Sequence, residues 1–210
     1  MTQFKAPTQE RSRATLTRLY ETTNELMNEK DFSKITMAEI SARAGVTIGS
    51  IYQRFGSKKD LLWWMYENYV GEAATIYDEL FSAPKESAVE TRAEVLIRTL
   101  IRVWSPNKGV IRSLLLMYRQ DREAIPVRFR ETLEGAYEDS ARFLLGDDVS
   151  EAESEKGVFA ITLILSACRE QILFHEEQWD TVKTIDRDRF IALLVQAVTG
   201  VLRREANGHG

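Results

Sequence analysis

The sequence of 210 residues is poor in cysteine and has no long uninterrupted apolar run. Its one cysteine, Cys168, excludes an internal disulfide framework and fits a reducing compartment. No such run approaches the roughly 18 residues of a membrane span, and the first residues hold no apolar segment of the signal-peptide kind. We therefore expect a cytoplasmic protein that is not inserted in a membrane.

The residue patterns of common enzyme and metal sites are missing as well. The histidines are His175 and His209, and His175-Glu176-Glu177 is not the H-E-x-x-H zinc motif. Cys168 has no histidine one helical turn away. Neither a glycine-rich phosphate loop nor a G-x-S-x-G nucleophile elbow occurs. We expect neither an enzyme nor a protein that carries a metal or a cofactor.

Charge is present in both signs, but it is unevenly divided along the chain. The formal net charge is −4, which taken alone disfavours a nucleic-acid-binding protein. Residues 1–60, however, hold 10 Lys and Arg against 7 Asp and Glu, a charge of +3, and the remainder holds 18 against 25, a charge of −7. Attraction for phosphate is therefore expected only near the N-terminus.

A capping box precedes a predicted short helix that begins at about Met37. Thr36 and Glu39 have the S/T-x-x-E spacing in which the hydroxyl accepts an N–H of the first turn and the carboxylate bonds back to the cap. Ile35 and Ile40 flank the cap at the positions of a hydrophobic staple. These signals predict where the helix starts.

A second short helix follows after a turn of about three residues. Gly45 stands where a left-handed residue ends a helix, and Thr47 can cap the next one, which is expected over residues 48–55. Ile51 and Phe55 lie four residues apart and share one face of that helix. This spacing is typical of a helix-turn-helix, whose second helix enters the major groove of DNA.

At these residues the chain resembles a known family. The residues that carry the resemblance are Thr36, Ile40, Ala44, Gly45, Val46, Gly49, Ile51, Tyr52, Phe55, Ser57, Lys58 and Leu61. Their spacing is similar to the N-terminal signature of the TetR family of bacterial transcriptional regulators, over about residues 9–62. The resemblance implies an Ω-shaped, all-helical homodimer whose C-terminal domain binds a small effector.

Candidate DNA contacts divide into base contacts and phosphate contacts. The side chains expected to enter the groove belong to Thr47, Ile48, Gly49, Ser50 and Gln53, because Ile51 and Phe55 must face the core. In proteins that this chain resembles, the positions of Thr36, Tyr52 and Lys58 contact phosphate. Arg43, Arg54 and Lys59 are additional candidates for phosphate contacts, and a solvated surface is the alternative for each of them.

The rest of the chain carries helical periodicity and no convincing strand pattern. We expect an all-α fold of about nine helices, with a helix-turn-helix domain over residues 1–56 and a ligand-binding and dimerisation domain over residues 57–210. The third helix of the motif is expected to begin at Ser57 and to end or bend at Gly71. The last two helices, about 151–176 and 186–205, are apolar enough to need a partner surface, which predicts a homodimer through a four-helix bundle.

Aromatic residues in the middle of the chain suggest a pocket for a small effector. The candidate pocket residues are Trp104, Tyr118, Tyr137, Phe159 and Arg169, although for each of them an ordinary place in the core is the alternative. The sequence thus predicts a regulator that binds double-stranded operator DNA, most simply a repressor released by a largely hydrophobic effector. A regulator controlled by a protein partner without a small ligand is the other possibility.

Overall fold

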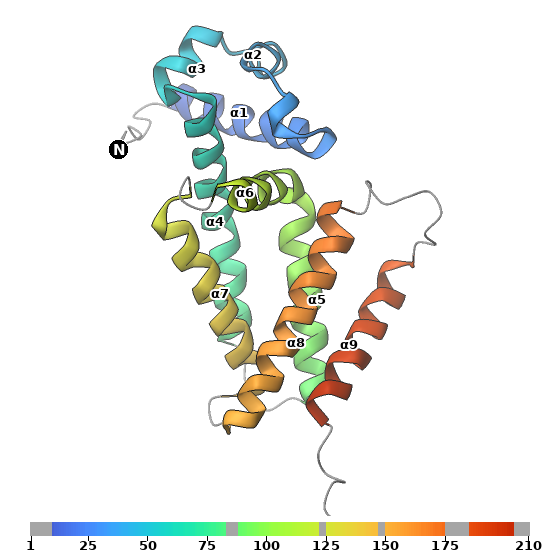
Figure 1. Ribbon diagram of the computed structural model, residues 1–210. Helices are drawn as coiled ribbons and strands as arrows, with labels where there is room; N and C mark the ends of the chain where they lie inside the picture. The colour runs from blue at the N-terminus through green and yellow to red at the C-terminus, as the bar shows by residue number, and fades with distance from the viewer. Residues whose placement is uncertain (1–9, 83–87, 122–124, 147–149, 175–184, 204–210) are drawn as a thin grey trace, which may run out of the picture. The chain divides into compact units, whose positions relative to one another are not determined.

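The computed structural model describes residues 10–82, 88–121, 125–146, 150–174 and 185–203. The α-helices are α1 (Glu10–Glu29), α2 (Met37–Ala44), α3 (Ile48–Phe55), α4 (Lys58–Phe81), α5 (Val89–Trp104), α6 (Lys108–Gln120), α7 (Val127–Leu145), α8 (Glu151–Arg169) and α9 (Arg187–Arg203) (Figure 1). Short 3-10 turns occupy Phe32–Lys34 and Ser105–Asn107, and a π-helical turn, Glu170–Phe174, continues α8. No strand occurs in these ranges, so the predicted all-α fold is confirmed for them. His175 and His209 lie outside the described residues.

The chain forms two compact units. The N-terminal unit consists of the described residues up to Ala73 together with Asn107–Gln120, so it contains α6 as well as the first three helices. The C-terminal unit consists of the described residues of Ala74–Pro106 and of the chain from Asp121 onward. Helix α4 is divided between the two units: its residues up to Ala73 belong to the N-terminal unit, and those from Ala74 belong to the C-terminal unit.

The core of the N-terminal unit is built from apolar residues of α1, α2, α3, α4 and α6. Its fully buried side chains include Leu19, Leu26, Met27, Ile40, Ile51, Phe55, Leu61, Met65, Val110 and Leu114. Helix α1 packs against both α2 and α6, and α2 packs against α3. Burial of each large apolar side chain contributes roughly 1.5–3 kcal/mol, so α1 is the element that holds this unit together.

Helix α6 approaches α1 so closely that a glycine is required at the contact. A Cβ atom on Gly109 would lie 2.2 Å from the carbonyl oxygen of Met27. The Gly109 N–H donates to Oδ1 of Asn28 at 2.8 Å, and the buried guanidinium of Arg112 donates to the Met27 carbonyl at 3.2 Å. Asn28 therefore satisfies an N–H in the first turn of α6, while Arg112 satisfies a carbonyl near the C-terminal end of α1.

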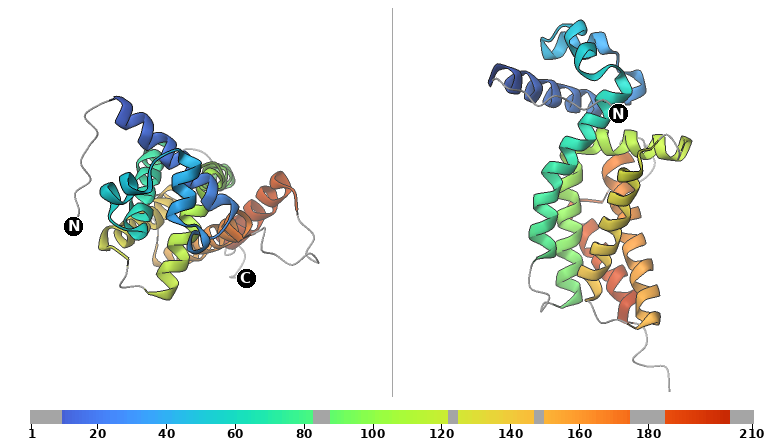
Figure 2. Two further views of the ribbon diagram at one scale, coloured as in Figure 1. Left: turned by 90° about the horizontal axis from the view of Figure 1, so that it is seen from above. Right: turned by 90° about the vertical axis from the view of Figure 1, so that its left-hand side faces the viewer.

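The C-terminal unit is a helical bundle. Helices α5, α7, α8 and α9 run along one another in Figures 1 and 2, and α9 packs on α5 and α8 while α7 packs on the same two helices. The buried residues that they share include Leu96, Ile97, Leu100, Leu144, Ile161, Ile164, Cys168, Ile191, Leu194 and Val198. Burial raises the pKa of the Cys168 thiol to about 12, as expected for a small apolar core residue rather than a reactive one.

Several helix boundaries differ from those expected. Helix α4 does not end at Gly71 but continues to Phe81, because a single glycine weakens a helix without breaking it. A 3-10 turn, Ser105–Asn107, separates α5 from α6. Residues Ser154–Phe174 reach the length and mean hydropathy (1.5) of a membrane span, with 33% of that window buried. The sequence prediction missed this stretch because it counted only runs uninterrupted by charges such as Arg169.

Candidate nucleic-acid interface

Helix α2 is held in place by the capping signals seen in its sequence. Oγ1 of Thr36 accepts the N–H of Glu39 at 3.1 Å, and the flanking Ile35 and Ile40 are both buried. The pKa of the Glu39 carboxyl lies below its ordinary value, chiefly because of the hydrogen bond from Lys30. The backbone of Thr36 lowers this pKa to a smaller extent. The Thr36 arm of the predicted capping box is thus formed, and the residues of its hydrophobic staple are buried.

The turn between α2 and α3 is closed by Gly45 in the left-handed conformation (φ 61°). The hydroxyl of Ser41 donates to the carbonyl of Val46 at 2.6 Å and ties the turn to the end of α2. A residue with a Cβ atom would be strained at position 45, since only glycine adopts this φ without cost. The turn thereby fixes the direction in which α3 leaves.

Helix α3 has one buried face and one exposed face. Ile51 and Phe55 are each about 1% exposed, and the Phe55 ring lies 5.0 Å from the ring of Trp64 on α4. The exposed residues of α3 and its cap are Thr47, Ile48, Gly49, Ser50, Tyr52, Gln53 and Arg54. Oγ1 of Thr47 accepts the N–H of Ser50, as predicted for the N-cap. Every residue predicted to contact bases therefore lies on a solvent-exposed surface.

The N-terminus of α4 is capped by Ser57, whose Oγ accepts the N–H of Asp60 at 3.1 Å. Lys58, predicted to contact phosphate, lies with its ammonium 4.6 Å from the centre of the Phe32 ring and donates to the carbonyl of Ser33 at 3.2 Å. Partial burial lowers the pKa of Lys58. Lys59, by contrast, is exposed. Of the two lysines, Lys59 has the freer ammonium.

The two arginines predicted to contact phosphate both have partners within the N-terminal unit. Arg43 pairs with Glu29 and Glu25 of α1, and Arg54 donates to the hydroxyl of Ser12 at 3.1 Å. Sequence reasoning missed these carboxylates because Glu29 stands 14 residues before Arg43, a separation that no helical spacing rule connects. It also missed the contact between α1 and α6 that Asn28, Gly109 and Arg112 form. A glycine in the first turn of α6 is the only feature of the local sequence that indicates this contact.

The candidate effector residues are distributed over both units. Tyr118 belongs to the N-terminal unit, whereas Trp104, Tyr137, Phe159 and Arg169 belong to the C-terminal unit. Trp104 is partly buried and its indole N–H donates to the hydroxyl of Tyr77 at 3.2 Å. Arg169 donates to the hydroxyl of Ser166. These two side chains therefore each have a partner within the described part of the chain.

Tyr137 and Phe159 have different environments. The Tyr137 hydroxyl donates to the carbonyl of Val158 at 2.7 Å and lies 2.9 Å from the hydroxyl of Thr162, so it joins α7 to α8. Phe159 is 57% exposed and therefore does not point into the interior of its own unit. Tyr137 remains a candidate wall residue, and Phe159 lies on an outer face.

Comparison with known proteins agrees with this geometry. Residues 19–62 match the model of the family described as bacterial regulatory proteins, tetR family. No match was found among curated proteins. A transcriptional regulator from Aquifex aeolicus is similar over 89% of this chain and 99% of its own, with 22% identity and a TM-score of 0.61.

Two further solved structures have a similar fold at lower identity. A tetR-family transcriptional regulator from Streptomyces coelicolor has 14% identity and a TM-score of 0.64, covering 90% of this chain and 80% of its own. A TetR-like transcriptional regulator from a Rhodococcus species has 14% identity and a TM-score of 0.59, covering 96% and 100%. Residues 19–62 of this chain therefore match the TetR family of bacterial regulatory proteins, and about nine tenths of the chain share the fold of solved structures described as regulators of that family.

Proposed function

We propose that this protein is a sequence-specific DNA-binding transcriptional regulator. The observation that carries the proposal is the exposed face of α3, which presents a row of small, polar and apolar side chains while Ile51 and Phe55 fix the helix from behind. A helix held at its back by a core and capped at its N-terminus is suited to insertion into the major groove. A formal charge of +3 over residues 1–60 favours phosphate at the same end of the chain.

Each exposed residue of α3 has a chemical role in this proposal. Gln53 can bond to adenine through its amide, and Ile48, which is 42% exposed, can contact the methyl group of thymine. Gly49 has open space around its Cβ position, so the backbone can come close to DNA. Thr47 and Ser50 offer hydroxyl groups. The proposed phosphate contacts are Thr36, Tyr52, Lys58 and Lys59.

A homodimer is the second part of the proposal, and the outer faces of α8 and α9 support it. Val158 and Phe159 on α8 are at least half exposed although they are large and apolar. On α9 an open groove of about 530 Å³ is lined by Leu193, Gln196, Ala197, Gly200 and Val201. Exposed apolar faces of this kind are typical of an interface, and a twofold arrangement would place two copies of α3 on a palindrome with half-sites about 10 base pairs apart or a multiple of that.

The third part of the proposal is that a small, largely hydrophobic effector releases the protein, acting as a repressor, from its operator. The support for it is the group of partly buried, polar-tipped aromatic residues packed against the core of the C-terminal unit, among them Tyr77, Trp104 and Tyr137. Rings that carry a hydroxyl or indole N–H can both line an apolar cavity and orient a ligand. A panel of apolar small molecules should then quench tryptophan fluorescence and weaken DNA binding together, and an effect on neither would favour control by a protein partner.

The experiment that tests DNA binding is selection of genomic fragments by the purified protein at low salt. Enrichment of a fragment with an inverted repeat is expected, because each protomer would contribute one recognition helix. The matched control is a protein with Ile48, Ser50 and Gln53 all changed to alanine, which leaves the buried face of α3 intact. If the unaltered protein enriches no fragment over this control, DNA-binding regulation is wrong.

A further inference from the structure

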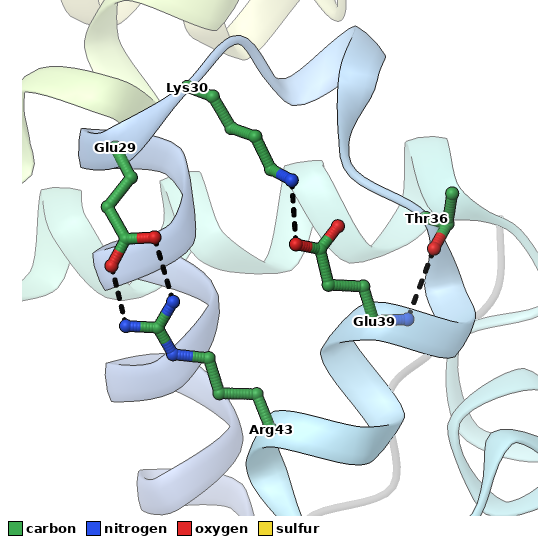
Figure 3. A network of polar contacts seen from close by, with 5 residues as sticks. All are labelled: Glu29, Lys30, Thr36, Glu39 and Arg43. Atoms are coloured by element: carbon green, nitrogen blue, oxygen red, sulfur yellow. Dashed lines mark hydrogen bonds and ion pairs between the residues drawn. The ribbon is translucent and has the colours of Figure 1, made fainter.

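Arg43 is held by carboxylates of α1 rather than left free at the protein surface. Its Nη1 donates to Oε2 of Glu29 at 2.8 Å, and its Nη2 donates to Oε1 of the same carboxylate at 2.6 Å, as Figure 3 shows. Nη2 also lies 3.5 Å from Oε2 of Glu25. A bidentate arginine–carboxylate pair fixes the orientation of both side chains, which a single contact does not.

The other end of α2 is tied to the end of α1 by a second, independent ion pair. Nζ of Lys30, the residue after α1, donates to Oε1 of Glu39 at 2.6 Å. Glu39 stands in the first turn of α2 and Arg43 in its last turn. The two pairs therefore hold α2 at both ends (Figure 3). Isolated surface ion pairs contribute little, but bidentate geometry within a network of charges is the case in which they matter.

The same network disfavours a phosphate contact by Arg43. The guanidinium carries one positive charge, and the carboxylates of Glu25 and Glu29 beside it carry two negative charges. A phosphate approaching Arg43 would have to break the bidentate pair and would meet the excess negative charge. Lys59 shows the contrast, because it is an exposed cation for which no ion pair is found in the described residues.

We propose that Arg43 is a positioning residue, whose bidentate bond to Glu29 sets α2 on α1 and thereby sets the direction in which the recognition helix α3 is presented. Arg43 acts through the short turn at Gly45, since α3 begins four residues after α2 ends. The part that concerns DNA rests on the proposed function. The part that concerns α2 does not, because it can be measured in the free protein.

The first test needs no DNA and uses amide hydrogen exchange of the full chain. Arg43→Gln should speed exchange of the α2 amides severalfold, and the charge-swapped pair Glu29→Arg with Arg43→Glu should restore protection. The matched control is Arg98→Gln in the C-terminal unit, since Arg98 is also half exposed and pairs with Glu94 at 2.8 Å. Unchanged exchange in α2 on Arg43→Gln would overturn the proposal.

The second test measures the affinity for the selected operator as a function of salt. Arg43→Gln and Arg43→Lys should both weaken binding, by about two- to fivefold, with the salt slope unchanged, because lysine lacks the fork that the bidentate bond needs. The charge-swapped pair should recover most of the affinity. If Arg43 contacted phosphate, Arg43→Gln would instead lower the salt slope by about 0.9 for the lost contact. Arg43→Lys would keep most of the affinity, and the charge-swapped pair would not restore it.

The two tests separate the failure of the inference from that of the proposed function. If the unaltered protein binds no DNA, the proposed function is wrong, while the hydrogen-exchange result still decides whether Arg43 positions α2. If DNA binds, α2 exchange is unchanged, Arg43→Lys binds like the unaltered protein and Arg43→Gln lowers the salt slope, Arg43 is a phosphate contact and the positioning role is wrong.

Discussion

At the start of the recognition helix, the hydroxyl groups of Thr47 and Ser50 bond to each other, which limits the hydrogen bonds that either can form with a base. Oγ1 of Thr47 and Oγ of Ser50 lie 2.7 Å apart, and Thr47 already accepts the N–H of Ser50. One hydroxyl proton is therefore shared within the cap instead of being directed at DNA. Gln53 has no such partner within the described residues, so its amide keeps both its donor and its acceptor for base contact.

Gln53→Ala should weaken DNA binding in a sequence-dependent way, whereas Lys59→Ala should weaken it for every sequence. Loss of an amide that bonds to adenine should cost roughly 1–3 kcal/mol on the matched operator and little on a scrambled one. Loss of the Lys59 ammonium should weaken both and lower the salt slope by about 0.9 per contact. Fluorescence anisotropy on the two DNA duplexes at several salt concentrations measures both effects. Equal losses on both duplexes for Gln53→Ala would contradict its base contact.

The pKa of the Glu29 carboxyl should lie below its ordinary value of 4.5, chiefly because of the hydrogen bonds from Arg43. Since the folded pKa is the lower one, the stabilisation by this pair is complete above pH 4.5 and is lost as the pH falls through the lowered value. Titration of the side-chain carboxyl by NMR measures this midpoint. In Arg43→Gln the midpoint should move back towards 4.5, and a midpoint that does not move would exclude the bond in solution.

Residue roles could be predicted from the sequence where the partner is local. The caps Thr36 and Thr47 were predictable because the hydroxyl of each accepts an N–H three residues later, a separation that helix geometry sets. The pairing of Arg43 was not predictable, since its partner is on another helix. An exposed arginine near a DNA-binding motif has the same sequence signal whether it contacts phosphate or a carboxylate.

At the scale of elements, α6 is the helix whose place was not expected. It comes from the middle of the chain, yet it completes the core of the N-terminal unit with Val110 and Leu114. The predicted boundary between residues 56 and 57 separates a DNA-binding domain from a ligand-binding and dimerisation domain, and it stays a prediction. Compactness alone assigns residues 57–73 and 107–120 to the same unit as the helix-turn-helix.

Gly109→Ala should destabilise the N-terminal unit. The added methyl would overlap the backbone of Met27, which cannot rotate away, and the overpacking should cost about 1–3 kcal/mol. Gly71→Ala is the matched control. It lies in α4 with nothing within 4 Å of its Cβ position, so it should stabilise the helix by roughly 0.5–1 kcal/mol. Urea unfolding measures both, and equal effects of the two changes would contradict the close contact.

The faces of α8 explain another limit of sequence prediction. The helix is apolar on more than one side, so helical spacing alone does not indicate which of its apolar residues face the core. The core is in fact formed by Ala160, Ile161, Ile164 and Cys168, while Val158 is 50% exposed. A helix with two apolar faces has no single stripe that indicates the inward one.

For the whole molecule, the exposed apolar surface on the last two helices predicts its assembly state. Phe159→Glu together with Leu193→Glu should convert a dimer to monomers, because a charge would be buried at the interface, and should raise the dimer dissociation constant about 30-fold or more. Val127→Glu is the control, since Val127 is exposed to the same extent, 57%, on α7. Sedimentation velocity measures the mass, and a monomeric unaltered protein would exclude the dimer.

The contact between Gly109 and Met27 also affects the order in which the protein can mature during synthesis. The helix-turn-helix leaves the ribosome early, but the surface of α1 that receives α6 remains uncovered until residues 107–120 have been made. Between these two stretches the ribosome must produce the end of α4 and all of α5. A nascent chain shorter than about 120 residues thus carries the recognition helix without the complete core that supports it.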